Sequence, residues 1–274
     1  MILGASGMLG VCITEVLKDH DTLTFTSKTL DITCTHAFHQ RVAMFRPDYI
    51  INCAAYTAVD LAESDAAKAY TINASAVEKM AQVAAHFKAT LIHFSTDYVF
   101  DGNATSPYAV NYPTAPVNTY GASKLAGEDA IRAVNSAYYI FRVSWLYAPH
   151  GKNFFCWVAN TAMQDLNIVD SQTGSPTSAL DVATFIKHLV ENDPVAYGTY
   201  HFTNTGSCTW YAFAKATNEK LGLNKKINPV ASFKTAAVRP AYSVMDTSLA
   251  QKTFSHHIQS WQDALDEVII QFKS

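Results

Sequence analysis

The sequence predicts an α/β fold: a Rossmann-like, doubly wound parallel sheet with a smaller C-terminal substrate-binding lobe. Short apolar runs alternate with amphipathic stretches through the first half of the chain, as in βαβ units. A glycine-rich turn over residues 4–10 (GASGMLG) follows the first apolar run and precedes a helical one. We expect residues 1–147 to form the nucleotide-binding domain. Residues 148–274 are expected to form mainly the lobe, with 178–193 packing back on the sheet.

Each element of the first half is predicted from its own pattern. Apolar or β-branched runs predict strands at residues 1–3, 22–26, 48–53, 90–95 and 138–143. Helical spacing predicts helices at residues 11–17, 36–45, 62–87 and 120–134, the third of them with an irregular start. Residues 101–119, rich in Pro, Asn and Thr, predict a long loop, and loops of this length are usually functional or disordered. Its position before the helix at 120–134 favours a functional loop.

The second half is less regular. Helices are predicted at residues 154–164, 179–191, 210–221 and 260–272. Strands are predicted at residues 168–169, 199–203 and 227–230.

Composition excludes several classes of function. The 274 residues are 49% hydrophobic and 16% charged with a net charge of −3, so no polybasic patch predicts a nucleic-acid or membrane partner. The five cysteines are widely spaced without a Cys-x-x-Cys pair, which argues against a zinc site and fits a reducing compartment. No apolar stretch approaches a membrane span and no signal peptide opens the chain, so we expect a cytoplasmic protein without a bound metal. Homodimers are the commonest assemblies of soluble proteins, and on this general ground alone a homodimer is the expected assembly.

The glycine turn predicts a dinucleotide site. Gly4, Gly7 and Gly10 follow a strand and open a helix, where glycine permits a tight turn, an approach to pyrophosphate and close helix packing. The helix N-terminus also favours phosphate, so Ser6, Met8 and Leu9 of the same turn are expected to contact the cofactor. The spacing differs from the commoner G-x-G-x-x-G, and a simple turn is the alternative.

The end of the second strand bears on the choice of cofactor. An acidic residue there binds the ribose 2′-hydroxyl of NAD, whereas a basic residue accepts the 2′-phosphate of NADP. The strand is followed by Ser27 and Lys28, with no acid before Asp31. Lys28 therefore favours NADPH over NADH, although it is equally compatible with a solvated surface lysine. Asp31 and Ile32 are expected near the adenine.

Three residues form the predicted catalytic group. Tyr120 and Lys124 are one helical turn apart, so the ammonium can stabilise the phenolate as Tyr120 gives its proton to a carbonyl oxygen. Thr96 ends the fourth strand at the ligand-binding edge of the sheet, where its hydroxyl can hold the same oxygen. Asp97 is expected to accept a sugar hydroxyl or to close the following turn. A core tyrosine with a surface lysine is the alternative for the pair.

These residues resemble a known family. Residues 95–102 (STDYVFDG) and 120–128 (YGASKLAGE), together with 52–60 (NCAAYTAVD), are similar to extended short-chain dehydrogenase/reductases and, within them, to the dTDP-4-dehydrorhamnose reductase family. The resemblance continues through residues 142–147, 174–177 and 239–240 into the second half. It implies an NAD(P)H-dependent oxidoreductase that reduces the C4 ketone of a nucleotide-linked 6-deoxy-4-keto sugar, as in rhamnose biosynthesis.

The resemblance also implies roles for individual residues. The catalytic trio is Thr96, Tyr120 and Lys124. The cofactor side includes Ala54, Ala55, Tyr56, Asn73 and Phe94. The substrate side includes Asp97, Tyr98, Trp145, Asn153 and Arg239, with Trp145 against the sugar and Arg239 near the diphosphate.

The chain departs from the family pattern at three places. Residues 109–112 (AVNY) replace a frequent acidic pair, Ser171 replaces an aspartate, and Cys12 stands where some bacterial members carry a glutamate that supports a magnesium-bridged dimer. Two alternatives therefore accompany the main prediction. One is a UDP- or CDP-linked 4-keto sugar reductase or epimerase/reductase, with Cys156 and His201 as candidate acid–base residues. The other is a non-catalytic dinucleotide-binding subunit resembling the regulatory subunit of methionine adenosyltransferase.

Overall fold

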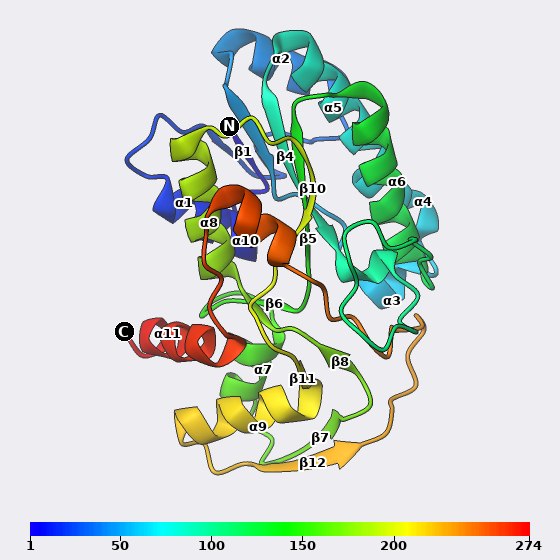
Figure 1. The fold of residues 1–274 in the computed structure, drawn as a ribbon, viewed down its shortest axis with the longest axis vertical. Helices are drawn as coiled ribbons and strands as arrows, with labels where there is room; N and C mark the ends of the chain where they lie inside the picture. The colour runs from blue at the N-terminus through cyan, green and yellow to red at the C-terminus, as the bar shows by residue number, and fades with distance from the viewer.

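A six-stranded parallel sheet forms the upper part of the molecule in Figure 1. The computed structural model describes residues 1–274. The strand order is β10–β5–β4–β3–β1–β2, and every neighbouring pair is parallel. The strands are β1 (Ile2–Leu3), β2 (Thr24–Phe25), β3 (Tyr49–Asn52), β4 (Thr90–Thr96), β5 (Tyr138–Val143) and β10 (Gly198–His201). The chain moves outward from β1 to β2 and then returns to the other side of β1 with β3. This reversal leaves a crevice at the carboxyl ends of β1 and β3.

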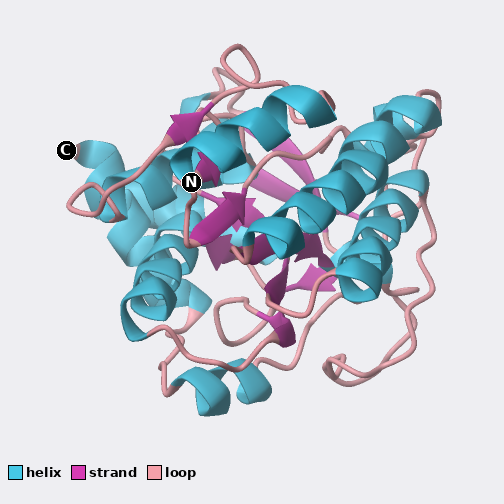
Figure 2. Cartoon of the chain, turned by 90° about the horizontal axis from the view of Figure 1, so that it is seen from above, coloured by secondary structure: helices cyan, strands magenta, loops and turns pink.

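Helices cover both faces of the sheet, as Figure 2 shows from above. One face packs on α1 (Met8–Val16), α8 (Ala179–Asn192) and α10 (Ser248–Phe254) through a core that includes Ile13, Phe141 and Phe185. The other face packs on α2 (Thr35–Phe45), α5 (Ala76–Phe87) and α6 (Thr119–Val134) through Val42, Met80 and Ile131. The predicted doubly wound α/β fold is confirmed. None of the helices combines the length and the apolar character that a membrane span requires.

Apart from α8, α10 and β10, the second half builds the lower part of the molecule in Figure 1. Its helices are α7 (Phe154–Asn160), α9 (Trp210–Leu221) and α11 (Trp261–Lys273), which share a core with Tyr147 and Phe213. Three small strand pairs accompany them: β6 (Leu146–Tyr147) with β9 (Thr177–Ser178), β8 (Thr173–Gly174) with β11 (Cys208–Thr209), and β7 (Asp165–Val169) with β12 (Lys226–Val230). Residues 178–193 lie largely in α8, which packs on α1.

Two predicted helices differ from the structure, and one helix was not predicted. The helix predicted at 62–87 is divided into α3 (Val59–Ala62), α4 (Ala66–Tyr70), a π-helical turn (Thr71–Ser75) and α5. At the first break, the backbone N–H and hydroxyl of Ser64 both donate to Leu61 O, which competes with the helical pattern. The helix predicted to reach residue 164 ends at Asn160, since Thr161 is extended and the chain next pairs with β12. The strand predicted at 199–203 is β10 and completes the main sheet, whereas α10 was not predicted.

Residues 238–244 of the second half pack against the predicted loop at residues 101–119. Backbone hydrogen bonds join Tyr108 N to Val244 O at 2.9 Å and Tyr242 N to Gly102 O at 3.2 Å. The Asn118 side chain donates to Val238 O at 2.8 Å. The loop that leads to Tyr120 is therefore ordered by residues far away in the sequence, and Figure 1 shows the two segments side by side.

Gly10 allows α1 to lie against the turn that precedes it. A Cβ atom at this position would lie 2.2 Å from Gly4 O and 2.8 Å from the Cα atom of Ala5. We expect Gly10→Ala to lower the free energy of unfolding by about 1–3 kcal/mol, because the helix must move away from this turn. Chemical denaturation measures the change. Glu15→Ala on the exposed face of α1 is the control, and equal stability of the two variants would contradict the close approach.

Candidate active site

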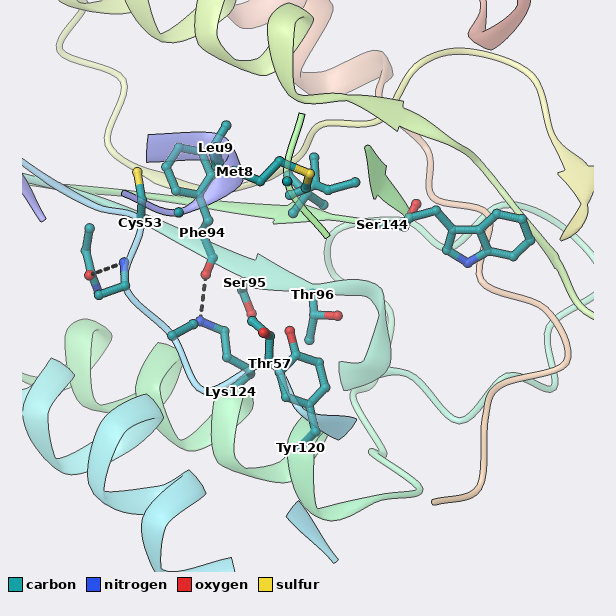
Figure 3. A pocket seen from close by; sticks show the side chains of 18 of the residues that line it. Met8, Leu9, Cys53, Thr57, Phe94, Ser95, Thr96, Tyr120, Lys124 and Ser144 are labelled. Atoms are coloured by element: carbon teal, nitrogen blue, oxygen red, sulfur yellow. Dashed lines mark hydrogen bonds between the residues drawn. The ribbon is translucent and has the colours of Figure 1, made fainter. Parts of the chain in front are cut away.

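A cleft of about 570 Å³ opens at the crevice between the ends of β1 and β3. Its wall is formed by the glycine turn after β1, the segment after β3, the end of β4 and the first turn of α6. Figure 3 shows Met8 and Phe94 on one side and Tyr120 and Lys124 on the other. The structure thus brings the predicted cofactor turn and the catalytic trio to one site.

The glycine turn has the geometry of a phosphate site. Gly4 has a φ of +70°, and a Cβ atom there would lie 2.7 Å from Ala54 N. The N-cap of α1 is Gly7, and no side chain caps the helix. The N–H groups of the first turn therefore have no capping oxygen and point toward the space where a pyrophosphate fits. Ser6, Gly7, Met8 and Leu9 all line the cleft.

A second hollow of about 290 Å³ continues the cleft past the glycine turn. It shares Ser6, Gly7, Ala54 and Ala55 with the main cleft and ends at Ser27, Leu30, Asp31 and Ile32. Two joined hollows on either side of a phosphate turn fit the two nucleoside halves of a dinucleotide. The Lys28 side chain is exposed and lines neither hollow.

Helix capping places Tyr120. Asn118 is the N-cap of α6 and accepts a hydrogen bond from Gly121 N at 2.8 Å, so the helix begins one residue before Tyr120. Tyr98 packs edge to face on the Tyr120 ring, with centroids 5.8 Å apart. In Figure 3 the Tyr120 hydroxyl points toward the end of β4, where Thr96 lies. The Thr96 hydroxyl and the Tyr120 phenol can therefore meet one carbonyl oxygen.

Burial controls the proton affinities of the site. Desolvation raises the pKa of Tyr120 to about 12, although a hydrogen bond with Thr96 opposes the change. Desolvation lowers the pKa of Lys124 to about 8, against the opposing charge of Glu128. The Lys124 Nζ atom lies 2.7 Å from Phe94 O and 3.1 Å from His93 Nε2. The Lys124 Nζ atom is thus hydrogen-bonded to β4, and the stabilisation of the Tyr120 phenolate by Lys124 stays a prediction.

Asp97 is a buried carboxyl at the same edge. Desolvation raises its pKa to about 6, and hydrogen bonds from Ser243 and Thr96 oppose the change. The Thr96 hydroxyl donates to Asp97 Oδ1 at 3.0 Å, whereas Asp97 Oδ2 has no partner. Asp97 lines the cleft although this oxygen is buried, and a ligand hydroxyl that reached it would supply the missing hydrogen bond.

Four predicted contacts have other partners in the structure. Asn73 is buried, where it accepts from Tyr56 N and donates to Tyr56 O and to the Ser123 hydroxyl. Asn153 caps α7 and donates to Ala148 O. Asn73, Asn153 and Tyr56 do not line the cleft. The fourth is Gly10, whose place against Gly4 is structural. None of these four residues lines the cleft, and their contacts with a ligand stay a prediction.

Trp145 and Arg239, both predicted to contact the substrate, each have a partner within the protein. Trp145 lines the cleft, but one face of its ring stacks on Trp210 with centroids 3.6 Å apart. Arg239 donates twice to Asp60, at 2.6 and 3.1 Å, and lines a neighbouring hollow of about 530 Å³ together with Tyr98.

Neither predicted epimerase residue lies in the cleft. His201 is completely buried beside Arg142, and the Cys156 thiol contacts Ala148 O. Cys12, the residue at the family's magnesium-dimer position, is buried in the core.

Sequence reasoning missed several residues of the cleft. Ser144 lines it from the end of β5 and Lys152 from the second half, and Cys53 and Thr57 line it from the segment after β3. Cys53 and Thr57 lie within the run 52–60, whose similarity to the family was a usable signal. Lys152 follows a Pro-His-Gly loop and gave no signal, because contacts between distant segments, such as the hydrogen bond between His150 and Met8 O, bring that loop to the glycine turn.

The whole chain matches one family. The model of the RmlD substrate binding domain matches residues 1–274. The chain is also 39% identical over 236 residues to a dTDP-4-dehydrorhamnose reductase of Escherichia coli (strain K12), covering 81% of this chain and 79% of the relative. The chain belongs to the dTDP-4-dehydrorhamnose reductase family. The resemblance of its motifs to that family is thereby confirmed.

Solved structures of this family agree with the fold. A dTDP-4-dehydrorhamnose reductase from Clostridium acetobutylicum is similar with a TM-score of 0.95 and 35% identity, over 100% of this chain and 99% of that chain. A dTDP-4-dehydrorhamnose reductase from Bacillus anthracis, solved in complex with NADP, has a TM-score of 0.93 and 38% identity, with 98% of each chain covered.

Proposed function

We propose that this protein is an NADPH-dependent reductase of the C4 ketone of a dTDP-linked 6-deoxy-4-keto sugar. The observation that carries the proposal is the meeting of Thr96 and Tyr120 with a buried lysine in a cleft that begins at an uncapped glycine turn. The family relationship and the NADP complex of the Bacillus anthracis relative support the choice of reaction and cofactor.

The residues of this chain divide the reaction between them. The amides of the glycine turn bind the pyrophosphate, and Ser27, Asp31 and Ile32 surround the adenosine half. NADPH, when bound, supplies the hydride to the C4 carbon. The Thr96 hydroxyl, which donates to Asp97 in the unliganded cleft, turns to the ketone oxygen, and Tyr120 gives that oxygen a proton as the alcohol forms. The balanced result is one hydride and one proton added across the carbonyl group.

The substrate lies between the two halves. Asp97 uses its free oxygen to accept a sugar hydroxyl. The neighbouring hollow, lined by Tyr98, Trp157, Phe233 and Arg239, takes the nucleotide, with its apolar rings against the base. Arg239 is the one cation that lines this hollow and is our candidate for binding the diphosphate, and its pairing with Asp60 holds it in place.

The test measures NADPH absorbance in the presence of enzymatically prepared dTDP-4-keto-6-deoxy sugar. We expect turnover with this ketone and none with dTDP-glucose, which carries a hydroxyl at C4. Parallel assays with NADH and with UDP- or CDP-linked ketones report the cofactor and nucleotide preference. Cofactor binding without turnover of any of these ketones would contradict the proposal and favour a dinucleotide-binding regulatory subunit.

Three further predictions accompany this function. They are the division at residue 147, a homodimer and a cytoplasmic location. Limited proteolysis tests the division, sedimentation velocity measures the assembly, and cell fractionation measures the location.

A further inference from the structure

A row of buried polar side chains, joined by hydrogen bonds, lies behind Lys124. β3 and β4 pair so that Asn52 stands opposite His93, and both side chains are at most 1% exposed. Asn52 Nδ2 lies 3.0 Å from His93 Nδ1, and His93 Nε2 lies 3.1 Å from Lys124 Nζ. Neither Asn52 nor His93 belongs to the catalytic trio, yet they lead directly to one of its members.

A backbone hydrogen bond fixes which of these side-chain groups donate and which accept. Ala54 N donates to Asn52 Oδ1 at 3.1 Å, so the oxygen of the amide is fixed and the NH₂ group faces His93. His93 Nδ1 must then accept, and a neutral imidazole that accepts at Nδ1 carries its proton at Nε2. Burial and the Lys124 charge both lower the pKa of His93 well below its usual value, so the neutral ring is the relevant one. Its Nε2–H group therefore points at the Lys124 nitrogen.

A neighbouring N–H donor stabilises the neutral amine of a lysine relative to its ammonium. The neutral amine offers a lone pair to His93 Nε2–H, whereas the ammonium offers none and repels the donor. Lys124 meanwhile donates to Phe94 O at 2.7 Å, which the amine can also do, and Figure 3 shows this bond. The surroundings of Lys124 thus match an amine with one accepted and one donated hydrogen bond.

We propose that Asn52 and His93 are positioning residues for Lys124: the amide holds His93 as the Nε2–H tautomer, and this group stabilises the neutral amine that Lys124 becomes when it gives up a proton. The inference rests on the proposed function, in which Tyr120 loses a proton in each reduction. The tyrosinate is then reprotonated at the expense of the Lys124 ammonium, which lines the same cleft, and Lys124 is left as the amine. A proton from water restores the ammonium, so the cycle consumes one proton for each ketone reduced.

Other charged and titratable groups near Lys124 also influence its protonation. Glu128, one turn further along α6, favours the ammonium. The titratable groups in or behind the same cleft are Cys53, Asp97, Tyr120, Lys152 and Glu128. Because these groups are the same in the variants below, a change in Lys124 reports on Asn52 and His93.

The test reads the tautomer and the lysine directly, without turnover. Side-chain ¹⁵N spectra of the cofactor-free wild-type protein are expected to show His93 protonated at Nε2, with its signal assigned by its loss in His93→Gln. In Asn52→Asp the carboxylate accepts from Nδ1–H, so the tautomer should reverse. The pKa of Lys124, followed by the ¹³Cε shift, should then rise by about one unit or more. A wild-type His93 protonated at Nδ1 would overturn the proposal.

A double variant separates the tautomer from the added charge. If Asn52→Asp acts through His93, most of the rise in the Lys124 pKa disappears in the Asn52→Asp/His93→Gln background. An equal rise in both backgrounds means that charge alone acts, and overturns the proposal. In the active enzyme, the alkaline limb of kcat should move with the Lys124 pKa while KM stays unchanged. Since the wild-type spectrum needs neither a variant nor a substrate, a misfolded variant or an inactive reductase leaves that test intact.

Discussion

Tyr120→Phe is expected to lower kcat by about 10²–10⁴-fold, because the only removed atom is the hydroxyl that gives its proton to the ketone oxygen. Burial raises the pKa of Tyr120 to about 12, so the phenol is protonated before the reaction at neutral pH. The ring remains packed against Tyr98, so the cleft keeps its shape. NADPH oxidation with the dTDP-linked ketone measures the loss.

Binding measurements distinguish this chemical defect from a folding defect. The variant should still bind NADPH with nearly wild-type affinity, seen as the same ligand-dependent rise in melting temperature. Tyr112→Phe, at a partly exposed tyrosine outside the cleft, is the matched control and should keep full activity. Retention of more than about a tenth of kcat in Tyr120→Phe would mean that another group donates the proton.

The parts of the fold that sequence predicts best are those with strong local patterns. β5 has the predicted bounds and β4 differs by one residue, because strands covered on both faces are continuous apolar runs. Strand-end residues could also be placed, since the carboxyl edge of a parallel sheet is where ligands bind. Thr96 could be predicted in this way, and Tyr120 and Lys124 from their spacing of one helical turn; the structure brings all three to one cleft.

The remaining parts depend on contacts between distant segments. β10 contains Thr199, Tyr200 and His201, and only its pairing with β5 makes it part of the main sheet. α10 has two buried residues, Ala250 and Phe254, which is too few for a clear helical period.

The same limit applies to His93 and Lys124 in the site. A single histidine inside an apolar run gives no signal until the register of β3 and β4 places Asn52 beside it. The orientation of the Lys124 amine toward Phe94 O likewise follows from the packing of α6 on β4.

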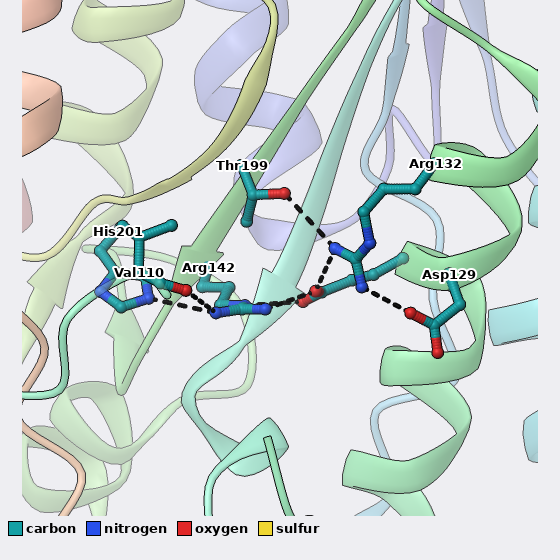
Figure 4. Close-up of polar contacts among 7 residues, drawn as sticks. Val110, Asp129, Arg132, Arg142, Thr199 and His201 are labelled. Carbon is teal, nitrogen blue, oxygen red and sulfur yellow. Dashed lines mark hydrogen bonds and ion pairs between the residues drawn. The ribbon is translucent and has the colours of Figure 1, made fainter. Parts of the chain in front are cut away.

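Glu128→Gln is expected to lower the free energy of unfolding by about 3–5 kcal/mol, because it removes one partner of a buried ion pair. The Glu128 carboxylate is completely buried and accepts from Arg142 Nε at 2.9 Å and Arg142 Nη2 at 2.8 Å. Arg132 adds a third bond at 3.0 Å. Figure 4 shows how Arg142 also reaches Val110 and His201, so the pair joins α6, β5, β10 and the loop before Tyr120. The neutral amide would leave the Arg142 charge uncompensated inside the protein.

Asp129→Asn is the matched control, since it removes the neighbouring carboxylate of the same helix. Asp129 also pairs with Arg132, at 2.6 Å, but its side chain is 65% exposed, so we expect a loss of about 1 kcal/mol or less. Chemical denaturation at neutral pH measures both variants. Equal losses in the two would contradict a special role for the buried pair.

The pH dependence gives a second test of Glu128. Burial raises its pKa, but the hydrogen bonds and charge of Arg142 outweigh burial and hold the pKa below its usual value. A carboxyl with a lowered folded-state pKa contributes stability above its unfolded pKa of about 4.3, and this contribution is lost as the pH falls through the folded value. The stability difference between wild type and Glu128→Gln should therefore be largest at neutral pH and shrink in acid. A difference that stays constant down to the acid transition would mean that the lost stability comes from packing rather than from the charge of Glu128.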